Sequence, residues 1–261
     1  MSTHLINARR LQIIAPWAVT IGLFVVWETA CWLFSVPSFI LPRPSLIFKA
    51  MHEYQQQILQ HSLHTLFTTI IGFAIAVLVG MFIGLAVGAS QLIYIGFYPV
   101  LIGFNSIPKV ALVPIIVIWF GIGTIPAIIT AFSIAFFPIA VNIATGLATI
   151  EPEMRDVLRS LGANRWEILT KVGIPRSMPY LFASLKIAIT LSFIGSVISE
   201  TVASNRGIGY LMLSASSRFE VPLVFAGLVV VGAMGIGMYL ICVIFEKRMT
   251  KWAFRGNDLV S

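Results

Sequence analysis

The sequence predicts an all-α, polytopic membrane protein. Hydrophobic residues make up 58% of the 261 residues and charged residues only 10%, and the mean hydropathy is +0.96. Soluble domains carry roughly 25% charged residues. The apolar residues also gather into runs of about the 20 residues that a bilayer-spanning helix needs. We therefore expect a single transmembrane domain over residues 1–261, without linkers or internal repeats.

Six apolar runs predict six transmembrane helices. Several contain Gly or Pro, which membrane helices tolerate. The first run is too long for a cleavable signal peptide and lacks an A-x-A site, so we expect it to remain as the first span. The expected spans are about Leu11–Phe34, Leu63–Ala89, Gly96–Phe120, Ile125–Ala148, Met178–Ala203 and Val221–Phe245.

The distribution of Lys and Arg predicts the orientation. Six spans place both termini on one side, and a cytoplasmic location for them puts eleven of the 17 Lys and Arg residues in the cytoplasm and four outside. Only Lys109 and Lys186 then lie within spans. The positive-inside rule favours this arrangement. The net charge of +7 accordingly reflects topology and anionic lipid, and indicates no nucleic-acid partner.

Two outer segments are expected to carry structure of their own. The segment after Pro42-Arg43-Pro44 has apolar residues at helical spacing and predicts a helix lying on the outer membrane surface. These residues are Leu46, Ile47, Ala50, Met51 and Tyr54. The Gly- and Ser-rich segment Asn205–Glu220 suits a re-entrant or partner-facing turn, with a plain connecting loop as the alternative.

The chain lacks the motifs of membrane enzymes and of ATPases. No G-x-x-x-x-G-K-[ST] loop, H-E-x-x-H helix or G-x-S-x-G turn occurs, so we expect no catalytic residue and no ATP bound by this chain. Cys31 and Cys242 fall within spans and are interpreted as packing residues. No Cys accompanies His52, His61 and His64, so we expect no metal site.

The stretch Thr149–Pro179 is a polar, cation-rich island in this apolar chain. It predicts two short amphipathic helices, 152–161 and 165–172, neither long enough to span a bilayer. Pro152 suits a first helical turn, and Gly162 a helix end. Asn164 with Glu167 three residues later predicts a capping box, and Pro175 is expected to end the second helix.

The island resembles the EAA loop of ABC importer permeases. Gly162 and the segment Val172–Pro175 match the spacing of its G-x9-I-x-L-P ending, and Asp156 stands where the motif has glutamate. Further stretches resemble the nitrate, sulfonate and taurine subgroup, where the position of Thr68 is often arginine. They are Trp27-Glu28, Leu41–Ser45, Ile107–Gly123, Phe136–Leu147, Leu161–Ile189 and Ile198–Leu211.

The resemblance implies a homodimeric permease of a bacterial inner membrane. Its partners would be two cytoplasmic P-loop ATPase subunits, which bind the ATP and Mg, and an external substrate-binding protein. The subgroup implies a small anionic solute such as a sulfonate, taurine or nitrate. Related permeases serve pyrimidine precursors, bicarbonate and aromatic carboxylates, so a non-anionic solute is the alternative.

The resemblance also implies that the island, about residues 149–178, couples the spans to the ATPase. A rigid lever joined to the fourth and fifth spans would convert closure of the ATPase into movement of those spans. The alternative is an interfacial helix resting on anionic lipid. The expected coupling residues are Arg155, Asp156, Arg159, Gly162, Ala163, Arg165 and Pro175.

Lys109 leads the candidates for the substrate pathway. A charge at mid-membrane costs roughly 2.5–3.5 kcal/mol unless it faces a cavity or a partner, and Pro108 favours a break in the helix there. An ion pair with Glu28 or Glu200 is the alternative. The other pathway candidates are Asn105, Ser106, Asn142 and Glu200.

These candidates have structural alternatives as well. Asn142 could hydrogen-bond between helices, and Lys186 could extend its side chain to the interface. Glu200 and Arg206 could form a gate pair, contact the binding protein, or make an exposed ion pair of little consequence.

Two other kinds of protein remain as rivals. An ion-gradient-driven transporter or channel would need acidic or histidine relays deep in the spans, and only Glu28 and Glu200 are candidates. A membrane scaffold without transport would have no need for Lys109 beside a helix break.

Overall fold

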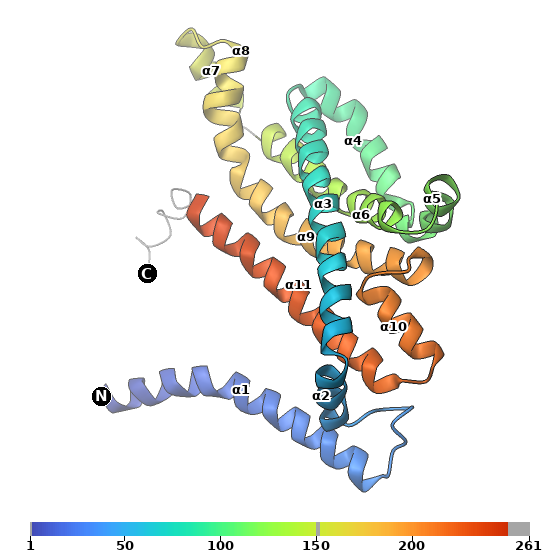
Figure 1. The fold of residues 1–261 in the computed structure, drawn as a ribbon. Helices are drawn as coiled ribbons and strands as arrows, with labels where there is room; N and C mark the ends of the chain where they lie inside the picture. Colours follow the sequence, from blue (N-terminus) through green and yellow to red (C-terminus); the bar gives the residue numbers. More distant parts are fainter. Residues whose placement is uncertain (1, 150–151, 250–261) are drawn as a thin grey trace. The chain divides into compact units, whose positions relative to one another are not determined.

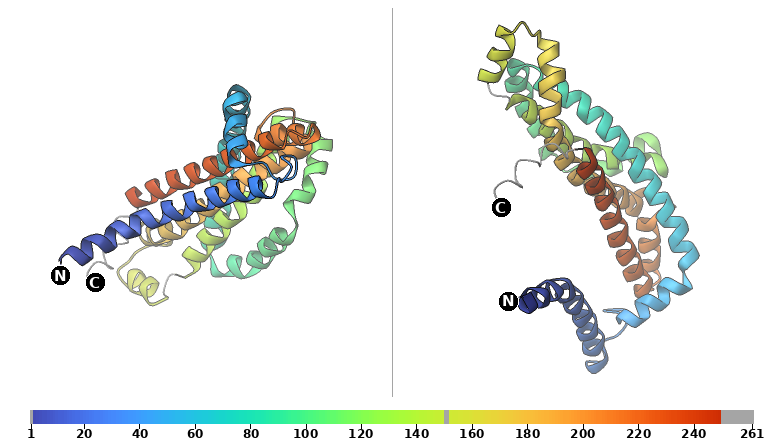
Figure 2. Two further views of the ribbon diagram at one scale, coloured as in Figure 1. Left: turned by 90° about the horizontal axis from the view of Figure 1, so that it is seen from below. Right: turned by 90° about the vertical axis from the view of Figure 1, so that its left-hand side faces the viewer.

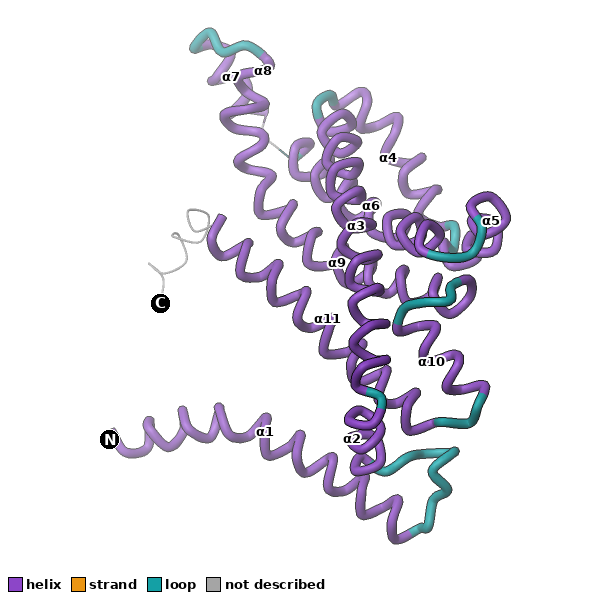
Figure 3. The backbone as a smooth tube through the Cα atoms, viewed as in Figure 1, coloured by secondary structure: helices purple, strands orange, loops and turns teal. Residues whose placement is uncertain are grey.

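The computed structural model describes residues 2–149 and 152–249; for residues 2–13, 152, 155 and 165 it describes the backbone alone. Every element in this part of the chain is a helix (Figure 3). The long helices are α1 (Ser2–Leu33), α3 (Gln55–Gly88), α4 (Gln91–Ser106), α6 (Thr124–Ala148), α9 (Ile174–Ala203) and α11 (Val221–Met249). The shorter ones are α2 (Pro44–Glu53), η1 (Lys109–Leu112), α5 (Val113–Phe120), α7 (Pro152–Ser160), α8 (Arg165–Ile168), η2 (Leu169–Gly173) and α10 (Ile208–Ser217).

Five of the described helices are long and apolar enough to cross a membrane. The third expected span, Gly96–Phe120, is not one helix: α4 and the η1–α5 segment meet at an angle of 71°, and they bring the number of spans to six if the bent pair counts as one. Pro108 lies in the break, where the missing N–H of proline prevents a continuous helical ladder.

The structure comprises two compact units, which we describe separately. One consists of Met1–Leu59 and Leu211–Val230, and the other of Gln60–Tyr210 and Val231–Ser261. The expectation of a single functional domain stays a prediction.

In the first unit, Glu28 of α1 binds the start of α2. Its carboxylate accepts hydrogen bonds from the backbone N–H of Ser45 at 3.0 Å and from the Ser45 hydroxyl at 2.7 Å. A carboxylate is favourable at a helix N-terminus, where backbone donors lack partners. Trp27 beside it packs on Phe225 of α11, with 6.1 Å between ring centroids. α2 lies within the segment expected to form the outer interfacial helix.

The second unit has its core where α6 packs along α9 and α3 (Figures 1 and 2). α3 carries a small residue at every fourth position from Gly72 to Gly88. A Cβ at Gly80 would lie 2.9 Å from the backbone oxygen of Phe136, and one at Gly84 would lie 2.7 Å from that of Ala140. Membrane helices associate closely through such small residues. The four-residue spacing of these small residues is visible in the sequence.

A half-buried ion pair joins α9 to α11 in the same unit. Nζ of Lys186 lies 3.0 and 2.8 Å from the two carboxylate oxygens of Glu246, and the two side chains are only 24% and 13% exposed. The interpretation of Lys186 as a residue that reaches the interface stays a prediction, to which the structure adds this partner. Glu246 was missed because the expected sixth span ended at Phe245, whereas α11 continues to Met249.

Candidate functional site

The island folds into a helical hairpin at the N-terminal end of α9 (Figures 1 and 2). α7 begins at Pro152, as expected from the conformation that proline favours in a first turn. Ile150 and Glu151 of the expected loop lie outside the described residues, as do the side chains of the coupling candidates Arg155 and Arg165.

Gly162 ends α7 through a complete Schellman motif. Its φ is +84°, its N–H donates to Arg159 O at 2.9 Å, and the N–H of Ala163 donates to Leu158 O at 3.0 Å. Because positive φ is costly for residues with a Cβ, glycine favours this tight reversal. The expected helix end at Gly162 is confirmed.

Asn164 and Glu167 then start α8 with the expected capping box. The Asn164 N–H donates to Glu167 Oε2 at 2.9 Å, and the Glu167 N–H donates to Asn164 Oδ1 at 2.8 Å. The two motifs together fix the turn between α7 and α8. Exposed pairs add local contacts, with Arg159 Nη1 3.7 Å from Asp156 Oδ1 and Lys171 Nζ 3.6 Å from Glu167 Oε1.

The expected stop at Pro175 is wrong. A π-helical turn, η2, leads from α8 directly into α9, so that Trp166–Ala203 forms one apolar segment of 38 residues. Proline in an ordinary α-helix clashes with the carbonyl four residues earlier, and the wider π turn before Pro175 relieves that conflict. Arg176 donates to Met154 Sδ at 3.6 Å and so joins α9 to α7. The second helix of the hairpin is thus continuous with the fifth span.

The hairpin exposes apolar side chains outside the expected bilayer. Val157, Leu161 and Trp166 are 58%, 78% and 70% exposed. A groove of about 340 Å³ lies between the two helices, and both apolar and charged residues line it, including Leu158, Ile168, Val172, Glu167 and Lys171. Apolar residues gathered on a polar segment mark an interaction surface. We call α7, α8 and η2 the coupling hairpin.

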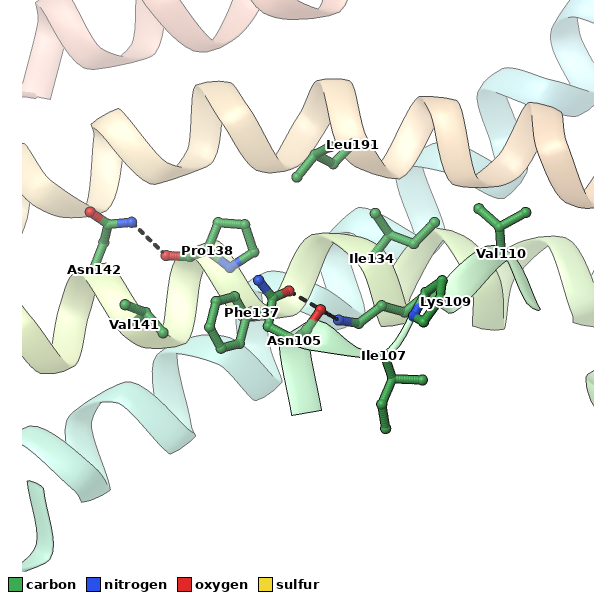
Figure 4. Close-up of a pocket in the computed structure, with 11 residues that line it drawn as sticks. Asn105, Ile107, Lys109, Val110, Ile134, Phe137, Pro138, Val141, Asn142 and Leu191 are labelled. Carbon is green, nitrogen blue, oxygen red and sulfur yellow. Dashed lines mark hydrogen bonds between the residues drawn. The ribbon is translucent and has the colours of Figure 1, made fainter. Parts of the chain in front are cut away.

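The break after α4 opens into a pocket of about 490 Å³ (Figure 4). Three of the expected pathway residues line it together: Asn105 and Lys109 from the break, and Asn142 from α6. The remaining lining is apolar and comprises Ile107, Pro108, Val110, Ile134, Phe137, Pro138, Val141 and Leu191.

Lys109 is held by the end of α4. Its Nζ donates to Phe104 O at 3.0 Å, to Asn105 O at 2.8 Å and to Asn105 Oδ1 at 3.0 Å, and lies 5.9 Å from the centre of the Phe137 ring. A cation is favourable at a helix C-terminus, where carbonyl groups lack partners. Within the described residues of its own unit Lys109 makes no ion pair, so the expected alternative pair with Glu200 does not form there. Glu28 belongs to the other unit, and a pair with it stays a prediction.

The other pathway candidates differ in their positions. Asn142 lines the pocket, but its Nδ2 donates to Pro138 O of its own helix at 2.8 Å, and it makes no bond to another helix among the described residues. The Ser106 hydroxyl donates to Ile102 O at 3.1 Å, and Ser106 does not line the pocket. Glu200 lies elsewhere and is fully buried.

Glu200 binds the turn that connects α9 to α10. Its Oε2 accepts the Thr65 hydroxyl at 2.8 Å and the Gly209 N–H at 3.2 Å, and its Oε1 lies 3.4 Å from the hydroxyl of Thr68 and 3.6 Å from His64 Nδ1. Thr68, the position that is often arginine in the resembled subgroup, here shares a hydrogen bond with Ser196. Arg206 is not among these partners, so the expected Glu200–Arg206 pair is wrong in this structure.

Comparison with known proteins decides the family. The family model described as "binding-protein-dependent transport system inner membrane component" matches residues 76–251. The chain belongs to this family of permeases.

Several relatives of the permease carry names that refer to different solutes. It is 31% identical to the riboflavin transport system permease protein RibX of Chloroflexus aurantiacus, over 88% of this chain and 87% of that one. It is 26% identical to the formylaminopyrimidine transport permease protein ThiX of Halalkalibacterium halodurans, over 94% and 98% of the two chains. The taurine transport system permease protein TauC of Escherichia coli is 26% identical, over 88% and 86%.

A solved structure shares the fold of the permease. A chain of the MetNI methionine ABC transporter superposes with a TM-score of 0.67 at 17% identity, over 76% of this chain and 98% of that one. Members of the family are polytopic inner-membrane components of ABC importers, which work with ATPase subunits and substrate-binding proteins, and are not enzymes.

Proposed function

We propose that this permease works as a homodimer that alternates access to a small solute while two ATPase subunits dock on its coupling hairpins. The exposed apolar surface of Val157, Leu161 and Trp166 is the observation that carries the proposal. Water-exposed residues of this kind lower the free energy of association when a partner covers them, by roughly 25 cal/mol per Å² of apolar surface.

The hairpin is also built to transmit force. The Schellman motif and the capping box define its turn, and η2 joins it to α9 without an intervening loop. A displacement of the hairpin by the ATPase would therefore move α9 directly. In the alternative, the hairpin rests on anionic lipid. The groove between its helices would then have no function.

Adding a charge to the apolar surface should prevent docking. We expect Leu161→Asp and Trp166→Asp each to lower co-purification of the ATPase at least tenfold, since a carboxylate would have to be buried without a partner. Phe219→Asp is the matched control: Phe219 is 79% exposed, lies in the expected outer turn and has a φ of +59°, which Asp tolerates better than Phe. Undiminished co-purification with both hairpin variants would contradict docking at this surface.

We further propose that both termini and the coupling hairpin are cytoplasmic, as the charge distribution predicts. Gln57, Ser216 and Asn164 are all exposed and suit single-cysteine labelling after Cys31 and Cys242 are replaced. An impermeant thiol reagent added to intact cells should modify cysteines at 57 and 216, and should reach a cysteine at 164 only after permeabilisation. Modification of a cysteine at position 164 in intact cells would contradict the proposed orientation.

The pocket at the helix break supports a small organic anion as the transported solute. Lys109 supplies a positive charge that only neutral oxygens contact within the described residues, so an anionic group entering the pocket would gain a charge-assisted hydrogen bond. Exposed apolar residues of α4 and the break, such as Phe104 and Ile107, flank the pocket. A second copy of the chain packed there would close it.

A neutral heteroaromatic solute is the second candidate. The ring of Phe137 and the amides of Asn105 and Asn142 line the pocket, and such groups stack on and hydrogen-bond to flat polar rings. The names of the riboflavin and formylaminopyrimidine permeases agree with this candidate, and that of the taurine permease with the anionic one.

A further inference from the structure

The turn between α9 and α10 combines a fully buried base with an exposed tip. Gly207, Ile208 and Gly209 are buried, whereas Asn205 and Arg206 immediately before them are exposed. The base is fixed by three side chains from two helices. Glu200 accepts the Gly209 N–H at 3.2 Å, Thr65 Oγ1 accepts the Ile208 N–H at 2.8 Å, and His61 Nδ1 accepts the Gly207 N–H at 3.1 Å.

Backbone conformation and packing reinforce these bonds. Gly207 has a φ of +98°, and a Cβ at this position would overlap the carboxylate of Glu200. The ring of Tyr210 packs on His61, with 5.8 Å between centroids. The tip is closed by Ser204, whose hydroxyl donates to Arg206 O at 2.7 Å and accepts the Arg206 N–H at 3.1 Å. The backbone of Arg206 therefore has one defined position relative to α3 and α9.

The same cluster connects a further element. His64 shares a hydrogen bond of 3.1 Å with Thr124 at the start of α6, and the Gly123 N–H donates to Ala203 O at 3.0 Å. The base of the turn thus belongs to the packed ends of α3, α6 and α9. A buried carboxylate is costly unless it is well hydrogen-bonded, and here its bonds hold the base of the turn.

The side chain of Arg206 has no partner to explain this fixed position. In the part of the chain that the structure describes, its guanidinium makes no ion pair or hydrogen bond. Arg218 in the next outer turn differs, because it lies 3.5 Å from Glu220 and donates to Ser214 O at 3.3 Å. The expected outer segments also carry more Arg and Lys than Asp and Glu, so an acidic partner is complementary to them.

We infer that Arg206 binds a surface carboxylate of the external substrate-binding protein, and that Glu200 is a positioning residue that fixes the turn for this contact. The inference rests on the proposed function, since it needs a binding protein on this side of the membrane. A fixed backbone lowers the entropy lost when Arg206 pairs with a partner, and the planar donors of its guanidinium match a carboxylate in a bidentate arrangement.

The test is the affinity of the purified binding protein for the purified transporter in nanodiscs of zwitterionic lipid, measured by surface plasmon resonance. Arg206→Glu should raise the Kd at least tenfold at 50 mM salt, and the difference from wild type should shrink at 500 mM, where charges are screened within a few Å. The Kd of Arg206→Lys should lie between those of the wild type and Arg206→Glu. Lys49→Glu, at an exposed lysine of α2, makes the same change in net charge and should leave the Kd within twofold.

Gly207→Ala tests the role of the turn without changing any charge. It should displace Arg206 and raise the Kd, while ATP hydrolysis without binding protein stays at the wild-type level. An unchanged Kd for Arg206→Glu, or equal increases for Arg206→Glu and Lys49→Glu, would overturn the inference. So would an effect of Arg206→Glu that appears only in anionic lipid, because Arg206 would then bind a headgroup. Absence of binding by the wild-type transporter would instead contradict the proposed function.

Discussion

Replacing Gly162 with valine should lower ATP-driven uptake by up to about tenfold while leaving the membrane-embedded fold intact. Gly162 is the left-handed residue of the Schellman motif, and nothing lies within 4 Å of where its Cβ would be. The cost of valine is therefore local backbone strain of about 1–2 kcal/mol, without any clash with the spans. Since 1.4 kcal/mol corresponds to a factor of ten, the hairpin would adopt its native turn roughly tenfold less often relative to alternative turns.

Gly162→Asn provides the matched control. Asparagine tolerates the left-handed conformation at a helix end, so uptake should stay near the wild-type rate. The measurements are ATP-driven uptake in proteoliposomes and the amount of ATPase that co-purifies with each variant. Equal activity of the valine and asparagine variants would show that the geometry of this turn does not matter for coupling.

Replacing Lys109 with methionine should lower uptake of an anionic solute at least tenfold without unfolding the protein. Methionine preserves the length and apolar stem of the side chain and removes the charge. A lysine at the middle of a membrane helix costs roughly 2.5–3.5 kcal/mol, whereas a cation at a helix C-terminus returns only about 0.3–1 kcal/mol. The loss of the bonds to Phe104 and Asn105 should therefore leave the thermal unfolding temperature unchanged or slightly higher.

Uptake of an aliphatic sulfonate and of riboflavin by the same variant separates the two solute classes. Loss of sulfonate uptake alone supports the anionic pathway, and a rate per folded transporter equal to wild type for both solutes excludes Lys109 from the pathway. A lower unfolding temperature would assign Lys109 to capping α4. Lys49→Met removes a charge at an exposed lysine and should change neither uptake nor stability.

Features determined by neighbouring residues could be predicted from the sequence. The glycine at the end of α7 and the capping box of Asn164 and Glu167 depend on contacts within five residues, and both are present. The expected stop at Pro175 failed for a local reason as well: a π turn, which no simple pattern marks, lets the helix continue through the proline.

Features that need distant residues could not be predicted. The neighbours of Glu200 are Thr65, 135 residues away in the chain, and Gly209, beyond the end of its helix. The pair of Lys186 with Glu246 could not be predicted, because Glu246 lies just past the expected end of the sixth span. The three polar residues of the pocket, in contrast, were found because charged and amide side chains are rare in apolar runs and therefore conspicuous.

The most direct test of the account is the energy source of transport. The permease would be reconstituted in proteoliposomes with its ATPase and binding protein, and uptake of labelled solute measured with ATP or with an imposed proton or sodium gradient. The account predicts uptake that requires ATP and the ATPase and that no ion gradient can replace. Gradient-driven uptake by the permease alone would contradict it and would identify a secondary transporter.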